Sequence, residues 1–368
     1  MKICFFCDIS TTVEGDTKGG GELQIYLLAK ELALNGHEVV IIDPYSIKNI
    51  TTKEGVKLIT IPNWNKGQRG FRMFFYRLPA LWKTFLEQNA DYYYVRMRSF
   101  LYFIPYMISR KKKAKFILAV ASDLDVLSLG KKFKYEYKPN FSLITFLTVY
   151  LPNDLIYNYL LKRADIVMLQ HSGQRLKSIS PKIKQVIFPN IIEVNTLSVS
   201  EKSIKSYFIY VGSLTMLKGA DNLFNLMNII NPSVEIMIVG SPKDHKSKLI
   251  YKKLATKKNI ILTGKKNRVA TLELISNAKA LINTSYFEGF PNVFLEAWSM
   301  GIPVISLNAN PGNVFDGNEL GICCNSDIIK MKHCIETNST GHLDKYKIRR
   351  YVEKFHNSQD ASERFLSM

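Results

Sequence analysis

The segment Ser285–Ser306, SYFEGFPNVFLEAWSMGIPVIS, constrains the fold of this chain more than any other. Its Glu-Gly-Phe-Pro turn predicts a helix that begins at Asn292, because proline is common where helices start. Gly301 follows the expected helix end at Met300, where a left-handed residue is favoured. The apolar residues from Pro303 onward predict a buried strand. The segment is therefore expected to be one turn–helix–strand unit of an α/β fold.

The same segment carries a candidate binding site. A Gly-Pro turn that enters a helix directs backbone N–H groups and the positive end of the helix dipole at one point, which suits a phosphate. Glu288 lies in the turn and Glu296 about one turn into the helix. Because carboxylates repel a diphosphate, we expect both to accept hydrogen bonds from uncharged sugar hydroxyls. The pattern predicts a nucleotide-sugar site; the alternative is an amphipathic helix with solvated glutamates.

The pattern E-G-F-P-N-x-F-L-E-A-W-S-M-G-I-P-V resembles the E-x7-E element of retaining glycosyltransferases of family 4, part of glycosyl transferases group 1. The resemblance implies the GT-B fold, in which two Rossmann-like domains face a central cleft and a C-terminal helix crosses back to the first domain. It covers nearly the whole chain and is tightest at residues 285–306.

The beginning of the chain predicts a doubly wound sheet. An apolar strand at Lys2–Asp8 runs into a loop with three glycines, and a helix is expected from about Leu23 to Asn35. Ligands of such sheets bind at the carboxyl ends of the strands. The loop is similar to the G-G loop of family 4, which implies that Gly20 and Gly21 lie near the diphosphate and the acceptor.

The second half repeats this pattern with a strand at Tyr207–Val211 and a turn that begins at Gly212. The turn is similar to the family's G-R-x-x-x-x-K-G, whose Arg and Lys hold the diphosphate. Lys218 occupies the lysine position, but Ser213 stands where the arginine is usual. Because a guanidinium makes strong phosphate contacts, either Lys265 or Lys266 substitutes for it or donor binding is weaker.

The sequence Ala-Ser-Asp-Leu-Asp follows a predicted buried strand at Lys115–Ala121. It is similar to an A-S-D-x-D element of a subset of family 4, which implies that Asp123 contacts the donor sugar or an acceptor hydroxyl. The alternative is that Asp123 caps the following helix. Gln170 and Gln174 match the same subset, and we expect structural roles for them.

The chain divides into two expected domains. Residues 1–190 are predicted to be an acceptor domain that ends at the Pro-Asn of Phe188-Pro189-Asn190, and residues 191–206 a linker. Residues 207–345 are predicted to be the nucleotide-sugar donor domain, and residues 346–368 a helix that packs on the first domain.

Composition limits the cellular setting. The 368 residues are 46% hydrophobic and 22% charged, which is typical of a soluble globular protein, and no apolar run is long enough to cross a membrane. Five cysteines, an odd number, indicate reduced thiols in the cytoplasm. The net charge of +19 and the mixed basic and apolar segments of the first half predict peripheral contact with an anionic membrane; the alternative is that these segments are ordinary core helices with solvated lysines. No nucleic-acid recognition motif is present.

These observations predict a hexosyltransferase-type enzyme. It would transfer sugar from a UDP- or GDP-sugar, with retention of configuration, to a saccharide acceptor expected to be lipid-linked. The product would be a surface polysaccharide such as capsule, O-antigen, lipopolysaccharide or exopolysaccharide. The resemblance implies catalytic roles for Glu288, Lys218 and Asp123. It implies donor binding by the following residues: Glu296, Gly289, Phe290, Pro291, Asn292, Gly212, Ser213, Gly20 and Gly21.

No metal or other cofactor is expected, since the resemblance implies metal-free transfer and Asp123-Leu124-Asp125 is not taken as a metal motif. Two alternatives stay open. One is a nucleotide-sugar epimerase of the same fold, and the other is a non-catalytic scaffold on a membrane, which the serine at position 213 would explain.

Overall fold

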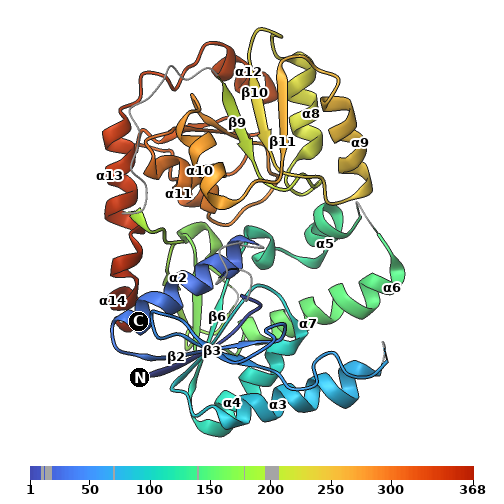
Figure 1. Cartoon of the computed structure of the whole chain (residues 1–368), viewed down its shortest axis with the longest axis vertical. Coiled ribbons are helices and arrows are strands. Elements are labelled where there is room, and N and C mark those ends of the chain that lie inside the picture. The colour runs from blue at the N-terminus through green and yellow to red at the C-terminus, as the bar shows by residue number, and fades with distance from the viewer. Residues whose placement is uncertain (10–11, 13–18, 69–70, 139–140, 178, 195–206) are drawn as a thin grey trace. The chain divides into compact units, whose positions relative to one another are not determined.

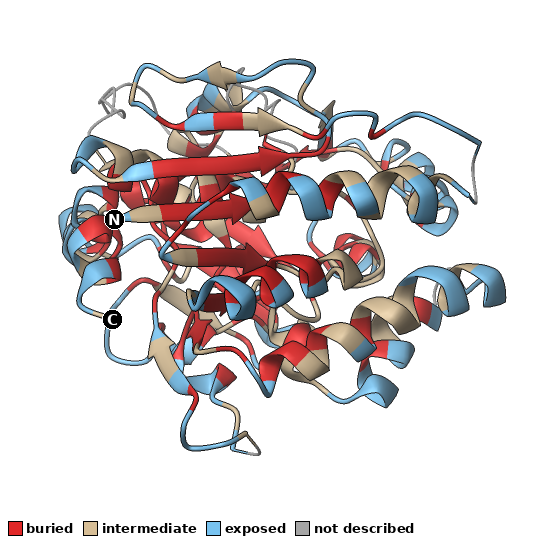
Figure 2. Cartoon of the chain, turned by 90° about the horizontal axis from the view of Figure 1, so that it is seen from below, coloured by how far each residue is buried: buried red, intermediate tan, exposed pale blue. Residues whose placement is uncertain are grey.

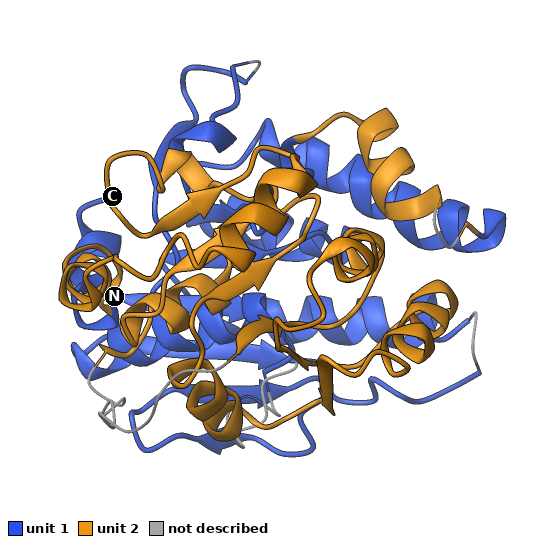
Figure 3. Ribbon diagram, turned by 90° about the horizontal axis from the view of Figure 1, so that it is seen from above, with its two compact units in different colours: residues 1–126, 142–191, 358–368 blue, residues 127–141, 192–357 orange. Residues whose placement is uncertain are grey.

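The computed structural model describes all residues except 10–11, 13–18, 69–70, 139–140, 178 and 195–206. The described chain forms two compact units, each a sheet of parallel strands with covering helices (Figures 1 and 3). Unit 1 comprises Met1–Val126, Ser142–Ile191 and Ser358–Met368; unit 2 comprises Leu127–Phe141 and Ile192–Asn357. The predicted α/β class with two Rossmann-like halves is confirmed.

The sheet of unit 1 has eight strands in the order β3-β4-β2-β1-β5-β6-β7-β8, and each adjacent pair is parallel except β3 and β4. The strands are β1 (Lys2–Phe6), β2 (Glu38–Asp43), β3 (Ile50–Thr51), β4 (Lys57–Thr60), β5 (Tyr92–Arg96), β6 (Lys115–Ala119), β7 (Ile166–Leu169) and β8 (Lys184–Ile187).

Neighbouring residues of each central strand enter different cores, because side chains alternate between the two faces of a sheet. In β1, Cys4 and Phe6 belong to one hydrophobic cluster, and Ile3 and Phe5 to another. All four are buried, and Figure 2 shows the central strands buried along most of their length. Burial on both faces explains why these strands are continuously apolar in the sequence.

Helices cover both faces of this sheet. Helix α2 begins at Gly20, earlier than expected, so Gly20 and Gly21 form its first turn. The helices are α2 (Gly20–Leu34), η1 (Met73–Arg77), α3 (Leu78–Glu87), η2 (Phe100–Tyr102), α4 (Phe103–Lys112), η3 (Asp123–Val126), α6 (Leu143–Thr145), η6 (Phe146–Tyr150), α7 (Leu151–Leu161), η7 (Ser172–Gln174), η10 (Ser358–Asp360) and α14 (Ala361–Leu366).

The sheet of unit 2 has six parallel strands in the order β11-β10-β9-β12-β13-β14. Strand β9 is central, and its residues Phe208 and Ile209 enter separate clusters on the two faces. The strands are β9 (Phe208–Val211), β10 (Ile236–Val239), β11 (Ile260–Gly264), β12 (Leu281–Asn283), β13 (Val304–Ser306) and β14 (Gly321–Cys323).

The helices of unit 2 include one segment from the first half of the sequence. Residues 127–141 cluster with this unit, and the Tyr135 ring lies 4.9 Å from that of Phe287 and 5.8 Å from that of Tyr286. The helices are α5 (Leu129–Lys132), η4 (Phe133–Tyr137), α8 (Ala220–Ile229), α9 (His245–Leu254), α10 (Arg268–Ser276), α11 (Asn292–Ser299), η9 (Pro311–Asn313), α12 (Ile328–Glu336) and α13 (Lys345–His356).

The C-terminal segment is shared between the units. Helix α13 packs on α11, where the Trp298 and Tyr351 rings are 6.0 Å apart. After Asn357, the last eleven residues belong to unit 1, and α14 packs on α2. There the Ser358 hydroxyl donates a 3.0 Å hydrogen bond to Glu31. The predicted return of the tail to the first domain is confirmed, but its helix is divided in two.

The expected domain boundaries stay predictions. Residues 127–141 belong to unit 2, whereas the sequence pattern predicts them in the first domain. Most of the expected linker at 191–206 lies outside the described residues. Within the part of the chain that the structure describes, the helices are too short or too polar to traverse a lipid bilayer.

Candidate active site

Two turns of unit 2 meet at the carboxyl edge of its sheet. One connects β9 to α8 and the other connects β12 to α11, and β9 and β12 are neighbours. Gly219 has φ +67°, and a Cβ built there would lie 1.9 Å from the Thr284 carbonyl oxygen. The Thr284 hydroxyl donates to the Gly219 carbonyl at 3.0 Å. This close backbone approach fixes the positions of the residues on either side of it.

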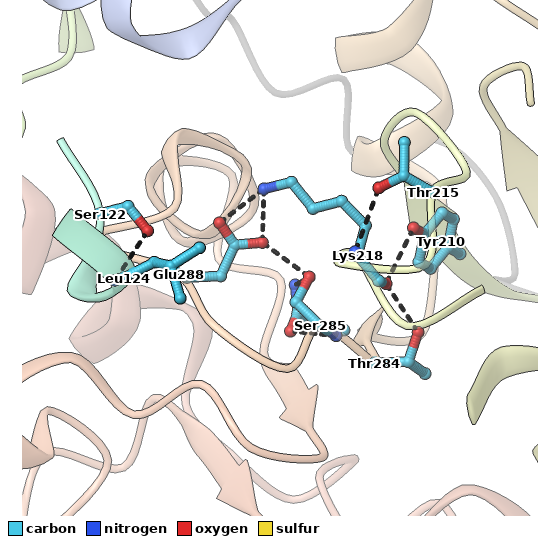
Figure 4. Close-up of polar contacts among 9 residues, drawn as sticks. Ser122, Leu124, Tyr210, Thr215, Lys218, Thr284, Ser285 and Glu288 are labelled. Atoms are coloured by element: carbon cyan, nitrogen blue, oxygen red, sulfur yellow. Dashed lines mark hydrogen bonds and ion pairs between the residues drawn. The ribbon is translucent and has the colours of Figure 1, made fainter. Parts of the chain in front are cut away.

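Lys218 and Glu288 are brought together by that approach (Figure 4). The Lys218 ammonium lies 2.7 Å and 2.6 Å from the two carboxylate oxygens of Glu288. The Ser285 hydroxyl donates a third contact, 2.6 Å long, to Glu288 Oε1. The Lys218 side chain is 37% exposed and that of Glu288 11% exposed, so a ligand from solvent can reach the ammonium. Two expected catalytic groups therefore lie in direct contact.

The beginning of α11 lies beside this pair. Pro291 is the N-cap residue of the helix, and no side chain caps its N–H groups. Phe290 is 5% exposed and contacts the rings of Trp298 and His356. Phe290 therefore anchors in the core the turn that carries Gly289 and leads to Asn292, the first residue of α11. Such a helix start favours an anion.

The turn after β9 is shaped by glycine. Gly212 has φ +153°, and a Cβ on neighbouring Gly240 would lie 1.9 Å from the Gly212 carbonyl oxygen. Among the described residues, no hydrogen-bond partner is found for the Ser213 side chain. Nothing in this geometry supplies the guanidinium that the family pattern has at position 213.

Glu296 faces a residue that the sequence analysis did not single out. Arg268 Nε is 3.7 Å from Glu296 Oε1, and the two side chains are 25% and 14% exposed. Burial raises the pKa of the Glu296 carboxyl above its usual value, and the positive charge of Arg268 opposes that rise. Glu296 is thus a desolvated carboxylate whose charge is balanced by one arginine. A basic residue at the start of a helix, four residues after the end of a strand, was the signal for Arg268.

Asp123 lies in unit 1, in the turn after β6. His171 Nε2 is 2.8 Å from Asp123 Oδ1, and Gln174 Nε2 donates to the same oxygen at 2.8 Å. The Asp123 side chain is 37% exposed. Both contacts are made to Oδ1. In the described part of the chain Oδ2 of Asp123 has no partner, so it can accept a hydrogen bond from a ligand hydroxyl. Sequence reasoning missed His171, although its position directly after a strand was a signal.

Asp125 binds the backbone of the turn that precedes it, whereas the Ser122 hydroxyl accepts from the Leu124 N–H of η3 at 3.3 Å. Asp125 Oδ2 accepts hydrogen bonds from the backbone N–H groups of Ala121 and Ser122, both 3.0 Å long. Its Oδ1 lies 2.8 Å from Arg98 Nε. Both acids of the Asp-Leu-Asp sequence are therefore engaged by protein donors. The described residues contain no group of three or more His, Cys, Asp or Glu side chains that could hold a metal ion.

Gly20 and Gly21 are also in unit 1, at the start of α2. A Cβ on Gly21 would lie 2.9 Å from Met97 Sδ, so the glycine permits close packing of the helix on the segment after β5. The expected site residues thus form two groups. One is in unit 2, around Lys218, Glu288, α11 and Glu296, and the other is in unit 1, with Asp123 and the start of α2.

Parts of the chain are similar in sequence to known proteins. Residues 197–325 match the family model of glycosyl transferases group 1. An uncharacterized glycosyltransferase of Methanocaldococcus jannaschii is 28% identical over 179 residues, which are 43% of this chain and 43% of that protein. The lipopolysaccharide 1,6-galactosyltransferase of Salmonella typhimurium is 30% identical over 143 residues, 37% of this chain and 40% of the relative. The matches span about two fifths of each relative's length.

Solved structures resemble the whole chain. The sucrose-phosphate synthase of Thermosynechococcus elongatus superposes with a TM-score of 0.79 at 14% identity, over 100% of this chain and 97% of that one. The lipopolysaccharide outer core galactosyltransferase WaaB superposes with a TM-score of 0.66 at 19% identity, over 100% of this chain and 98% of that one. HepE of Anabaena, solved with UDP-glucose, superposes with a TM-score of 0.68 at 13% identity, over 100% of this chain and 98% of that one. Residues 197–325 are therefore a glycosyl transferases group 1 domain, in a chain with the GT-B fold.

Proposed function

We propose that this protein is a glycosyltransferase that transfers a sugar from a nucleotide-diphosphate sugar to a saccharide acceptor. The observation that carries the proposal is the contact between Lys218 and Glu288 beside the uncapped start of α11. A diphosphate leaving group needs positive charge as the glycosidic bond breaks, and preorganised donors at that point are a main source of catalysis. Lys218 and the α11 N–H groups supply that charge.

The remaining residues receive roles that follow from their surroundings. Glu288 accepts a hydrogen bond from a hydroxyl of the donor sugar, and Glu296 accepts hydrogen bonds from the ribose hydroxyls. Both side chains can act only as acceptors, and both are close to the expected phosphate position. Asp123 accepts a hydroxyl of the acceptor or of the donor sugar through its free Oδ2. Gly20 and Gly21 allow a phosphate or an acceptor to approach the start of α2. We propose transfer with retention and without a metal.

The donor and the acceptor are inferred by analogy. HepE, which shares the fold, was solved with UDP-glucose, and this favours the UDP-sugar over the GDP-sugar as the donor here. The named relative that acts on lipopolysaccharide favours a lipid-linked saccharide acceptor and a role in surface polysaccharide synthesis. Such an acceptor would place the enzyme at the cytoplasmic face of the membrane.

Unit 1 carries a surface that fits this location. Residues 55–86 contain six Lys or Arg and no Asp or Glu. Phe71, Phe74 and Phe75, at the start of η1, are 66%, 68% and 69% exposed. Leu143 and Ile144 of α6 are 61% and 76% exposed. Exposed aromatic and aliphatic side chains among basic residues favour an anionic lipid surface.

Nucleotide binding is the test of the proposal. The midpoint of thermal unfolding would be measured with UDP, GDP, ADP and their sugars, for the unmodified protein, Lys218→Ala and Glu296→Ala. We expect one diphosphate to stabilise the unmodified protein and neither variant. Lys279→Ala, which removes a lysine elsewhere in unit 2, is the matched control. Absence of stabilisation by every nucleotide would favour the scaffold alternative, and sugar interconversion without an acceptor would favour an epimerase.

A further inference from the structure

Arg268 occupies a position that is electrostatically unfavourable for an arginine. It is the first residue of α10, where the positive end of the helix dipole disfavours a cation. The start of this helix is firmly set, because the Asn267 side chain accepts from the Ala270 N–H at 2.9 Å. The Arg268 backbone is therefore held in place, and its charge needs a compensating partner.

The partner in the structure is Glu296, but the pair is incomplete. Arg268 Nε is 3.7 Å from Glu296 Oε1, which is beyond hydrogen-bonding distance, and in the described chain this buried Nε has no acceptor. No described group donates a hydrogen bond to the Glu296 carboxylate. Two opposite charges thus face each other across a small gap, and neither has its hydrogen bonds satisfied. Unsatisfied buried groups of this kind are costly unless a ligand completes them.

A hydroxyl group suits this gap because it can donate and accept at once. A vicinal diol can donate one O–H to the Glu296 carboxylate while an oxygen of the same diol accepts from the Arg268 guanidinium. A phosphate fits less well, since it would be attracted by Arg268 but repelled by Glu296.

We propose that Arg268 and Glu296 together form a clamp for the ribose diol of the donor nucleotide, with Arg268 as a nucleotide-binding residue. This inference rests on the proposed nucleotide site. Arg268 then has a second effect as a positioning residue, because its charge keeps Glu296 ionised and able to accept both hydroxyls.

Among the residues around Glu296, Arg268 is the one whose substitution tests the clamp. Helix α11 packs against α10, α13 and β13. At its other end, Gly301 approaches Lys345 of α13, and His356 contacts Phe290 rather than Glu296. The charge that acts on the pKa of Glu296 is that of Arg268. Removing Arg268 should therefore raise this pKa further.

The test measures binding of UDP, GDP and ADP and of their 2′-deoxy counterparts by calorimetry, from pH 5 to pH 9. The proteins are the unmodified chain, Arg268→Gln and Arg268→Lys. Lys258→Gln, with the same charge change on an exposed side chain before β11, is the control. Circular dichroism at each pH confirms that all of them are folded.

We expect Arg268→Gln to weaken binding of the preferred ribonucleotide about tenfold, as for loss of one charged hydrogen bond. The preference for the ribonucleotide over its 2′-deoxy form should shrink. As the pH is lowered, Arg268→Gln should also lose nucleotide binding at a higher pH than the unmodified protein does. Arg268→Lys should restore the pH profile but only part of the affinity, and Lys258→Gln should change none of these.

Two results would overturn the clamp. One is unchanged affinity and pH profile in Arg268→Gln, and the other is equal weakening for ribonucleotide and deoxynucleotide. If the unmodified protein binds none of the nucleotides, the proposed function itself fails, and the clamp falls with it.

Discussion

At the scale of single residues, Lys218 and Glu288 neutralise each other in the structure. The carboxylate holds the ammonium with both oxygens, so a phosphate must compete with it for the lysine. We predict that Glu288→Gln binds a nucleoside diphosphate about fivefold more tightly, the equivalent of about 1 kcal/mol, while sugar transfer is lost. Calorimetry and a transfer assay would check this. Ser285→Ala, which keeps the carboxylate, is the control, and weaker diphosphate binding in Glu288→Gln would contradict the prediction.

Glu296 illustrates the cost of a binding residue to stability. Its pKa is raised in the folded protein, so the folded state binds a proton more readily than the unfolded state. The ionised group therefore destabilises the fold as pH rises from the unfolded pKa through the folded one. We predict that Glu296→Gln has a larger free energy of unfolding than the unmodified protein at pH 7.5, and that the difference shrinks towards pH 4. Urea denaturation at both pH values measures it, and a difference that grows on acidification would refute the assignment.

At the scale of elements, the site depends on how closely two turns approach. Gly219 and Gly264 have similar backbone angles, φ +67° and +69°, but only a Cβ at Gly219 would meet the Thr284 carbonyl. We predict that Gly264→Ala costs about 1 kcal/mol of stability from backbone strain alone. Gly219→Ala should cost about 3 kcal/mol or more, because the two turns must separate. Denaturant unfolding of both variants measures this, and equal losses would show that the approach is not tight.

At the scale of the whole molecule, a net charge of +19 requires an interacting surface or a tolerance for self-repulsion. We predict that the protein co-sediments with anionic vesicles and less with neutral ones, and that Phe74→Ser/Phe75→Ser weakens this severalfold. Ile47→Ser, at a 99% exposed apolar residue elsewhere in unit 1, should have no effect. Equal and negligible binding to both vesicle types would remove the membrane proposal.

Local patterns were enough to predict the elements of the fold. The continuous apolar runs predicted buried strands, and the ends of β1, β6 and β9 lie within two residues of expectation. The helix after Pro291 and the positive φ of Gly301 also agree, because proline and glycine determine backbone angles by themselves. These features depend only on residues close together in the sequence, so they can be predicted from the sequence alone.

The partners of the site residues required the tertiary structure. The Arg268–Glu296 gap, the support of Asp123 by His171 and the pairing of Lys218 with Glu288 join residues 28, 48 and 70 positions apart. The placement of residues 127–141 with unit 2 is equally non-local. The sequence by itself determined the strands, the helices and the kind of chemistry at each strand end. Only the tertiary structure decided which charged groups face each other, because sheet order and turn packing, not spacing along the chain, bring them together.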